Sequence, residues 1–503
     1  PAKQAARCGS FLARVLWEAG VPRDVLYSVQ LSEREFGQQL ISDPRVNQVI
    51  LTGGFETAQL FRQFRPDLHL LAETSGKNAI VITESGDLDL AAKDLAQSAF
   101  GHAGQKCSAA SIGILVGGVA TSERFHRQLL DATESMVVAW PTNPESRIGP
   151  VIEPANGKLL TALTTLNKGE KWLREPRQLD DTGQLWSPGI RTGVRPGSST
   201  HLIEFFGPHL SLMAARSLDH AVEIQNHVDY GLTAGLHSLN ADEVAFWLDR
   251  VAAGNVYINR GITGAIVRRQ PFGGWKKSAI GPGTKAGGPN YLFGLGRWSK
   301  SSSEPTTAVL DTTVKDLLLI AKAHVSTSDY DELFRSACND EVAMVEHFGQ
   351  SHDESQLESE RNVLRYVPSG CVLYLGPDAT PFEWWRSLIA WVRTPGNELG
   401  YAVDIPVGLN STLGLHNKTL LPINEGDLLA EIQHGHDPRV RVVGATAEFH
   451  NTHGRGDVTL AMYDQPVTEA GRIELLPYFK EQAISITAHR FGNPVPWVTE
   501  LAV

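Results

Sequence analysis

A nucleophile and a base stand in two short polar segments of this sequence. Cys107 lies in Gly101-His-Ala-Gly-Gln-Lys-Cys-Ser-Ala-Ala110, a turn with two glycines. A thiol in such a turn, beside Lys106, is where the pKa of cysteine can be lowered so that the thiolate acts as a nucleophile. Taken alone, a cysteine in an α/β protein is more often an inert buried thiol.

Glu73 is the candidate base. It opens the segment Glu73-Thr-Ser-Gly-Lys-Asn-Ala79 between two apolar runs, so its carboxylate would project from a strand end. Folds of the α/β class place their sites at such ends. A solvated loop glutamate is the alternative, and it is favoured for the residue taken alone.

Three further segments could bind a cofactor or a substrate. Thr52-Gly53-Gly54 precedes a helical pattern and can present backbone N–H groups to a pyrophosphate, although it can equally be a tight turn. Glu204-Phe-Phe-Gly-Pro208 offers a carboxylate for ribose hydroxyls and an aromatic ring, or simply a turn with a buried Phe. The glycine-rich loop 261–275 can turn backbone N–H groups toward a carboxylate.

The elements that must position these residues follow an α/β pattern. From residue 45 to about 300, short β-branched runs alternate with helical periodicity, which is typical of a largely parallel sheet. The spacing predicts strands at 46–51, 79–83, 112–116, 210–214, 233–237 and 255–258, and helices at 5–20, 87–100, 219–226 and 241–252. We therefore expect one large α/β unit in this region.

Composition narrows the class of protein. The 503 residues suffice for about three domains of roughly 150 residues each. A net charge of −11 without an obvious block argues against nucleic acid or an anionic membrane as the main partner. The four cysteines match neither a zinc motif nor a disulfide framework, and no apolar run approaches the roughly 18 residues that span a bilayer.

A second domain is expected after a polar linker. We place a partial dinucleotide-binding domain at 1–72, a catalytic domain at 73–298, the linker at 299–311 and a smaller α/β domain at 312–503. Segments 253–261 and 482–492 share a short β run followed by Arg and Gly, a faint internal echo. Four histidines of the last domain stand in loop-like sequence, and we predict no metal site there: His434, His436, His450 and His453.

Taken in order, these segments resemble the motifs of the aldehyde dehydrogenase superfamily. The cysteine follows the glutamate by 34 residues, and Gln270-Pro-Phe-Gly-Gly-Trp275 closes the series. Gly104-Gln-Lys-Cys-Ser108 and Thr263-Gly-Ala265 are similar to the branch that oxidises L-glutamate γ-semialdehyde. Residues 1–300 resemble the dehydrogenase part of the long-form bifunctional proline utilization A proteins, and 310–503 resemble their extra C-terminal domain.

The resemblance implies a partial Rossmann-type NAD-binding domain, an α/β catalytic domain and a C-terminal domain that lacks a nucleophile and covers or braces the catalytic one. Cys107 would attack the aldehyde carbon, and its own N–H would stabilise the oxyanion. Glu73 would activate the water that hydrolyses the thioester, releasing L-glutamate. The remaining residues implied are Gly53 and Gly54 for the pyrophosphate, Glu204 for the nicotinamide ribose, Phe206 for the nicotinamide, and Ser108, Gly264 and Ala265 for the substrate carboxylate.

The resemblance also implies partners. NAD is the expected cofactor, but Lys3, where many relatives carry an acidic residue, would tolerate the 2′-phosphate of NADP. FAD would belong only to an upstream proline dehydrogenase domain that this chain does not contain. The family's oxyanion asparagine and a ribose-binding lysine should precede Pro1, so the chain alone would lack part of its machinery. A cytoplasmic homo-oligomer acting on a small aldehyde is implied.

Three other functions stay open at this point. The chain could be a non-catalytic scaffold derived from such an enzyme, or an aldehyde dehydrogenase for another small aldehyde. A hydrolase using Cys107 and His102 shares the thiol but has no use for Glu204 or the Gly53 turn.

Overall fold

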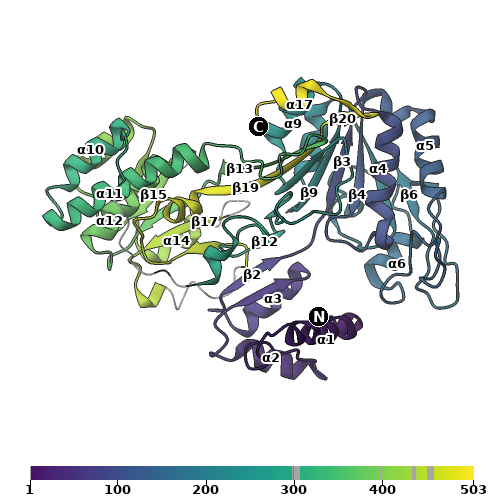
Figure 1. The fold of residues 1–503 in the computed structure, drawn as a ribbon, viewed down its shortest axis with the longest axis horizontal. Coiled ribbons are helices and arrows are strands. Elements are labelled where there is room, and N and C mark those ends of the chain that lie inside the picture. Colours follow the sequence, from purple (N-terminus) through teal and green to yellow (C-terminus); the bar gives the residue numbers. More distant parts are fainter. Residues whose placement is uncertain (1, 297, 299–305, 397, 433–437, 450–457) are drawn as a thin grey trace.

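The computed structural model describes residues 2–296, 298, 306–396, 398–432, 438–449 and 458–503. Three sheets organise the chain: a small N-terminal sheet, a central sheet of nine strands and a C-terminal sheet of five (Figure 1). This arrangement confirms the predicted α/β class with largely parallel strands.

The central sheet carries the strand pattern that the sequence predicts. Its strand order is β13-β19-β10-β9-β3-β4-β7-β6-β5, and the neighbours from β19 to β6 all run parallel. The nine strands are β3 (Asn78–Ile82), β4 (Ala110–Val116), β5 (Lys171–Arg174), β6 (Gly189–Thr192), β7 (His209–Ala215), β9 (Thr233–His237), β10 (Asn255–Ile258), β13 (Glu360–Pro368) and β19 (Phe479–Thr487).

Helices cover both faces of this sheet, because its strands are apolar on both sides. On one face Leu95 and Phe125 pack with Ile80, and on the other Trp247 and Val498 pack with Val81. The helices of this region are α4 (Leu88–Phe100), α5 (Glu123–Glu134), α6 (Gly157–Thr164), α7 (Ser199–Leu202), α8 (Leu218–Asn226), α9 (Ala241–Arg250) and α17 (Pro496–Glu500).

The N-terminal part is a three-stranded sheet flanked by helices. β2 lies between β1, its parallel neighbour, and the short antiparallel β12. Its elements are α1 (Ala6–Glu18), α2 (Arg34–Ser42), β1 (Val49–Thr52), α3 (Phe55–Phe64), β2 (Leu70–Glu73) and β12 (Ala279–Ile280). The amphipathic helix predicted at the start forms as α1, and its apolar residues Phe11 and Leu12 are exposed in this chain.

The C-terminal part is a second doubly wound sheet. Its strand order, β16-β15-β14-β17-β18, places the first strand of the series in the middle, as in Rossmann-type folds. Its elements are β14 (Val372–Leu375), β15 (Leu399–Ala402), β16 (Thr419–Pro422), β17 (Arg439–Val443), β18 (Ala461–Tyr463), α10 (Thr312–Ala321), α11 (Thr327–Ala343), α12 (Pro381–Arg393), α13 (Leu409–Gly414), α14 (Glu425–Ile432) and α16 (Gly471–Glu474).

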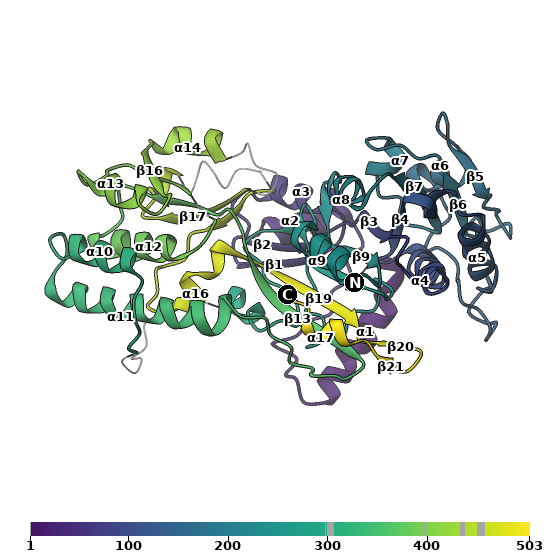
Figure 2. The same ribbon diagram turned by 90° about the horizontal axis from the view of Figure 1, so that it is seen from above.

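The C-terminal part also enters the central sheet. β19 pairs in parallel with β10, and β13 pairs with β19 in the antiparallel sense (Figure 2). The two segments that echo each other in sequence are therefore neighbouring strands, β10 and β19. The linker and domain bounds given above stay predictions, since 299–305 lie outside the described residues.

None of the helices in the described part of the chain is long and apolar enough to cross a membrane.

Candidate active site

The predicted nucleophile and the predicted base meet. Cys107 follows the short helix η2 (Gly101–Gly104) and precedes β4, whereas Glu73 is the last residue of β2. The thiol Sγ lies 3.9 Å from Glu73 Oε1 and donates to it. Both residues are half-buried, so they face each other at the edge of solvent.

The electrostatics of the thiol differ from the prediction. Burial raises the pKa of Cys107 to about 11, and the nearby Glu73 carboxylate raises it further. The N–H groups of Ser108 and Cys107 itself oppose this rise. The prediction that Lys106 lowers the thiol pKa was wrong, because burial and the Glu73 carboxylate raise the pKa of Cys107, and the exposed Lys106 is not among the groups that lower it.

Glu73 is a stronger base than an exposed glutamate. Burial raises its pKa, while Lys285 and the hydrogen bond from Cys107 oppose the rise. A carboxylate whose pKa is raised binds a proton more readily, which suits a general base. The pair therefore consists of a neutral thiol and a base placed to receive its proton.

The segment after Glu73 clamps the cysteine turn. The buried Asn78 donates from Nδ2 to Cys107 O at 2.7 Å and to Ala109 O at 2.9 Å. Its Oδ1 accepts from Thr233 N at 3.0 Å. A Cβ at Gly76 would stand 2.5 Å from Cys107 O, so only glycine allows this approach. Neither residue was predicted from the sequence, although both lie within five positions of Glu73.

Glu204 is also brought to this segment. Its Oε1 accepts from Gly76 N at 3.0 Å, and its carboxylate bonds to the Ser75 side chain. Burial raises the pKa of Glu204. The Lys77 ammonium, buried over the ring of Phe205 at 5.0 Å, has a pKa lowered by burial to about 7. Glu204 thus lies against the segment that follows Glu73.

Phe206 keeps a surface that a flat ring could contact. It is 41% exposed, and its backbone has a positive φ of 56°. Gly104 approaches the same turn so closely that a Cβ there would stand 2.2 Å from Gly207 O. The cysteine turn and the Glu204 turn are therefore packed backbone to backbone.

One backbone N–H group of the Gly53-Gly54 turn is not available to a phosphate as predicted. The N–H of Gly53 donates to Glu73 O at 3.1 Å, because β1 and β2 pair in register up to Thr52 and Glu73. This N–H is occupied and cannot serve a phosphate as predicted. Gly54 is the N-cap of α3, so the backbone N–H groups in the first turn of that helix are the donors that could face an anion. Glu56 stands in the same turn, 3.2 Å from the Cβ position of Gly54.

The residues expected to hold the substrate carboxylate lie on two elements. Ser108 is buried beside Cys107. Gly264, exposed and with a φ of +86°, and Ala265 lie in the loop after β10. Gln270 fixes this loop, since it accepts from Ile266 N at 2.9 Å and donates to Asn362 on β13 at 2.6 Å. Carboxylate binding by these residues stays a prediction.

The other candidates are placed apart from this site. The thiol of Cys107 bonds to Glu73 rather than to the exposed His102, which does not favour a Cys-His hydrolase. Cys338 and Cys371 are buried, and burial raises the pKa of Cys371 to about 12. Among the described residues no group of three His, Cys, Asp or Glu could hold a metal ion; His434, His436, His450 and His453 lie outside them.

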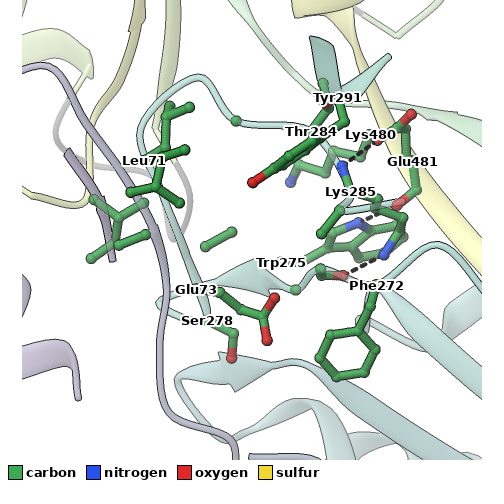
Figure 3. A pocket seen from close by; sticks show the side chains of 18 of the residues that line it. Leu71, Glu73, Phe272, Trp275, Ser278, Thr284, Lys285, Tyr291, Lys480 and Glu481 are labelled. Carbon is green, nitrogen blue, oxygen red and sulfur yellow. Dashed lines mark hydrogen bonds between the residues drawn. The ribbon is translucent and has the colours of Figure 1, made fainter. Parts of the chain in front are cut away.

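Glu73 also lines a pocket of about 130 Å³, and Cys107 is not one of the residues that line it. Lys285, Lys480 and Glu481 line it together with Glu73 (Figure 3). This group could not be predicted from the sequence, because Glu481 reaches the pocket only through the pairing of β19 with β10. Lys285 stands near the glycine-rich loop, but nothing in its local spacing points to Glu73.

The chain belongs to the aldehyde dehydrogenase family. The model of that family matches residues 1–294, more than half of the chain. The ordered motifs and the facing cysteine and glutamate agree with this membership.

Particular relatives narrow the comparison. The chain is 34% identical over 313 residues to 1-pyrroline-5-carboxylate dehydrogenase of Bacillus subtilis, covering 60% of each protein. It is 36% identical over 301 residues to the enzyme of that name from Geobacillus thermodenitrificans, covering 58% of each. The chain therefore spans about three-fifths of the length of these curated relatives.

Solved structures extend the likeness to the C-terminal part. Proline utilization A of Corynebacterium freiburgense matches 98% of this chain and 47% of its own, with 41% identity and a TM-score of 0.83. A 1-pyrroline-5-carboxylate dehydrogenase from Thermus with bound NAD matches 58% of each chain, with 31% identity and a TM-score of 0.53. Because it covers 98% of this chain, the likeness to proline utilization A includes the five-stranded C-terminal sheet.

Proposed function

We propose that the protein oxidises L-glutamate γ-semialdehyde to L-glutamate with NAD, the second step of proline catabolism. The observation that carries this proposal is the 3.9 Å contact between Cys107 Sγ and Glu73 Oε1, at the positions where the family's motifs place nucleophile and base. Relatives named 1-pyrroline-5-carboxylate dehydrogenase support the choice of substrate. NADP is a second candidate cofactor, since position 3 holds an exposed lysine instead of an acidic residue.

Cys107 acts as the nucleophile. Its thiol proton passes to the Glu73 carboxylate, and the sulfur attacks the aldehyde carbon to give a thiohemiacetal. The N–H groups of Cys107 and Ser108, which face the sulfur, are suited to the oxyanion. Ser108, Gly264 and Ala265 hold the substrate's carboxylate in this proposal.

Glu73 then completes the turnover. The protonated Glu73 releases the thiol proton to solvent before the second step. After oxidation the acyl group is a thioester on Cys107, and the ionised Glu73 takes a proton from the attacking water and passes it to the leaving thiolate. The burial that raises the pKa of Glu73 makes it a better proton acceptor at neutral pH. Hydrolysis restores the thiol and releases the carboxylic acid.

The residues present fit a nicotinamide dinucleotide. Glu204 keeps a half-buried carboxylate beside Cys107, Phe206 an exposed ring, and Gly54 the start of α3 for the pyrophosphate. Tyr230 lies near these groups. Burial and the carboxylates of Glu56 and Glu204 raise the pKa of its phenol, and the Ser75 side chain is hydrogen-bonded to it. When bound, the dinucleotide supplies the hydride acceptor.

An upstream proline dehydrogenase domain, which would carry FAD, and a homo-oligomeric state belong to the same proposal. The 98% coverage of this chain by proline utilization A supports the first. In that arrangement residues 312–503 brace the catalytic part and carry no chemistry of their own.

The test uses the natural protein that contains this chain. With L-glutamate γ-semialdehyde and NAD, we expect absorbance of the reduced nicotinamide to rise, and Cys107→Ser to abolish the rise. Glu73→Gln should still form the first equivalent of reduced cofactor slowly but fail to turn over. Equal rates for the wild type and both variants, or activity with other small aldehydes only, would contradict the proposal.

A further inference from the structure

A charged triad crosses the pocket beside the proposed base. Glu73 lies on one wall, on β2, and Lys285 and Glu481 lie on the wall opposite the N-terminal sheet (Figure 3). Lys285 belongs to the loop after β12, and Glu481 to β19, more than a hundred residues beyond the family's matched region. A residue of the C-terminal part therefore reaches the pocket of the catalytic base.

Lys285 is fixed in this position. Its side chain is buried, and Nζ donates to Asn255 Oδ1 at 2.9 Å and to the carbonyl of Gly273. Both acceptors are neutral, and within the part of the chain that the structure describes no carboxylate is hydrogen-bonded to this ammonium. A buried charge of this kind depends on charged groups at slightly longer range.

Glu481 is that group. It is buried, and its Oε2 accepts from Lys285 N at 2.7 Å, while Oε1 accepts from Asn290 Nδ2 at 2.8 Å. Trp275 Nε1 donates to Glu481 O at 2.9 Å. Pairing of Asn255 with Ala483 across β10 and β19 sets the register that brings these groups together.

The charges of the pocket act on one another. Burial lowers the pKa of Lys285 to about 7, and Glu481 and then Glu73 oppose this fall. Burial raises the pKa of Glu73, and Lys285 opposes that rise. Among the described residues, the other charged or titratable groups around the triad are Arg439, Lys480, Tyr291 and Tyr463 on the pocket wall, Cys107 against Glu73, and Tyr366 near Glu481.

We propose that Lys285 is a positioning residue that keeps Glu73 ionised for thioester hydrolysis, and that Glu481 of the C-terminal part keeps Lys285 charged. The inference rests on the proposed function. It gives residues 312–503 a part in catalysis that bracing alone does not supply: they set the protonation state of the base without touching the substrate.

The sign of the effect follows from the charges. Lys285→Met removes the cation, so Glu73 holds its proton to higher pH, and the acid limb of the kcat profile moves to higher pH. Glu481→Gln removes the carboxylate that stabilises the ammonium, so Lys285 loses its proton more easily and the limb moves in the same direction. We expect kcat at neutral pH to fall roughly tenfold in each variant and to recover at alkaline pH.

The experiment measures kcat against pH for the natural protein containing this chain and for these two variants. Lys285→Arg keeps the charge and should restore the acid limb toward the wild-type position. Glu474→Gln is the matched control, because Glu474 is a buried carboxylate of the same C-terminal part that pairs with Arg441 and does not line this pocket. It should leave the acid limb in place.

A second readout needs no turnover. The infrared carbonyl band of protonated Glu73, assigned by its loss in Glu73→Gln, should titrate at higher pH in Lys285→Met than in the wild type. Where Glu481→Gln fails to fold, Glu481→Asp keeps the charge and tests whether carboxylate position matters, with an acid limb between those of wild type and Lys285→Met.

The outcomes separate the two proposals. A wild-type protein that reduces the cofactor with this aldehyde, but whose Lys285→Met and Glu481→Gln variants keep the wild-type acid limb and Glu73 band, overturns the inference and leaves the function standing. A wild-type protein with no such activity overturns the function, and the inference falls with it.

Discussion

Replacing Asn78 by alanine tests whether the segment after Glu73 positions the nucleophile. Asn78 makes three buried hydrogen bonds: two to the carbonyls of Cys107 and Ala109 and one from the N–H of Thr233, at 2.7, 2.9 and 3.0 Å. The substitution leaves all three backbone groups without this partner. At about 1–2 kcal/mol for each of the three groups, the free energy of unfolding should fall by roughly 3–6 kcal/mol.

The fall in kcat should be larger than the loss of folded protein alone would cause. Without the bonds to Cys107 O and Ala109 O, the turn can shift its thiol relative to Glu73, and small misplacements of a nucleophile cost about a hundredfold in rate. We expect kcat to fall by one to two orders of magnitude, roughly, at temperatures where the variant is folded. Urea unfolding measures the first effect, and steady-state kinetics the second.

Asn226→Ala provides the control for this prediction. Asn226 also bonds to backbone groups, donating to Arg250 O at 2.8 Å and accepting from Ala252 N at 2.9 Å, but it lies away from Cys107. It should lower stability and leave kcat unchanged. If Asn78→Ala loses stability yet keeps the wild-type kcat and the wild-type rate of Cys107 alkylation, the clamp has no catalytic role and the reasoning is refuted.

Three further predictions follow from packing and charge. Gly76→Ala should impair folding or lower kcat at least about tenfold, because its Cβ would stand 2.5 Å from Cys107 O; soluble yield and kcat measure this. Alkylation of Cys107 should titrate near its raised pKa of about 11 and at lower pH in Glu73→Gln, since the variant removes a neighbouring negative charge. Asp340→Ala should lower the unfolding free energy by about 3–5 kcal/mol, because it leaves the buried Arg386 without its partner.

Each of these has an outcome that contradicts it. Gly101→Ala is the control for Gly76→Ala, since a Cβ at Gly101 meets only the Gln97 side chain, at 3.1 Å. Equal yield and kcat in the two alanine variants would show that the approach of Gly76 to Cys107 O does not matter. A thiol that titrates lower in the wild type than in Lys106→Met would restore the role first predicted for Lys106. An Asp340→Ala variant as stable as the wild type would mean that the Arg386 charge finds water or another acceptor.

Much of the central sheet was predictable because its strands are short β-branched runs between turns. The strands predicted at 233–237 and 255–258 coincide with β9 and β10. The first strand was expected from residue 46 but begins at Val49. Val46 belongs instead to a turn, in which its N–H donates to Asp43 O and Asp43 holds the Arg45 side chain.

The candidate site was predictable as a list of residues, and its electrostatics were not. Glu73 and Cys107 stand shortly before β3 and β4, two parallel neighbours in which Asn78 pairs with Ala110, so the starts of these two strands bring them close. The thiol pKa depends instead on burial, which no neighbour in sequence reports. The Gly53 N–H was assigned to a phosphate because a sequence cannot show that the register of β1 and β2 delivers it to Glu73 O.

The part of the site that could not be predicted from the sequence depends on contacts between segments far apart in the chain. Lys285 and Glu481 are 196 positions apart and join by a single backbone-to-carboxylate bond. That bond requires the C-terminal part to add β19 to the edge of the central sheet, beyond β10. A strand added at this edge both covers unpaired backbone groups and delivers a carboxylate to the pocket of the base. Loss of β19 should therefore change the chemistry of Glu73 as well as the stability of the sheet.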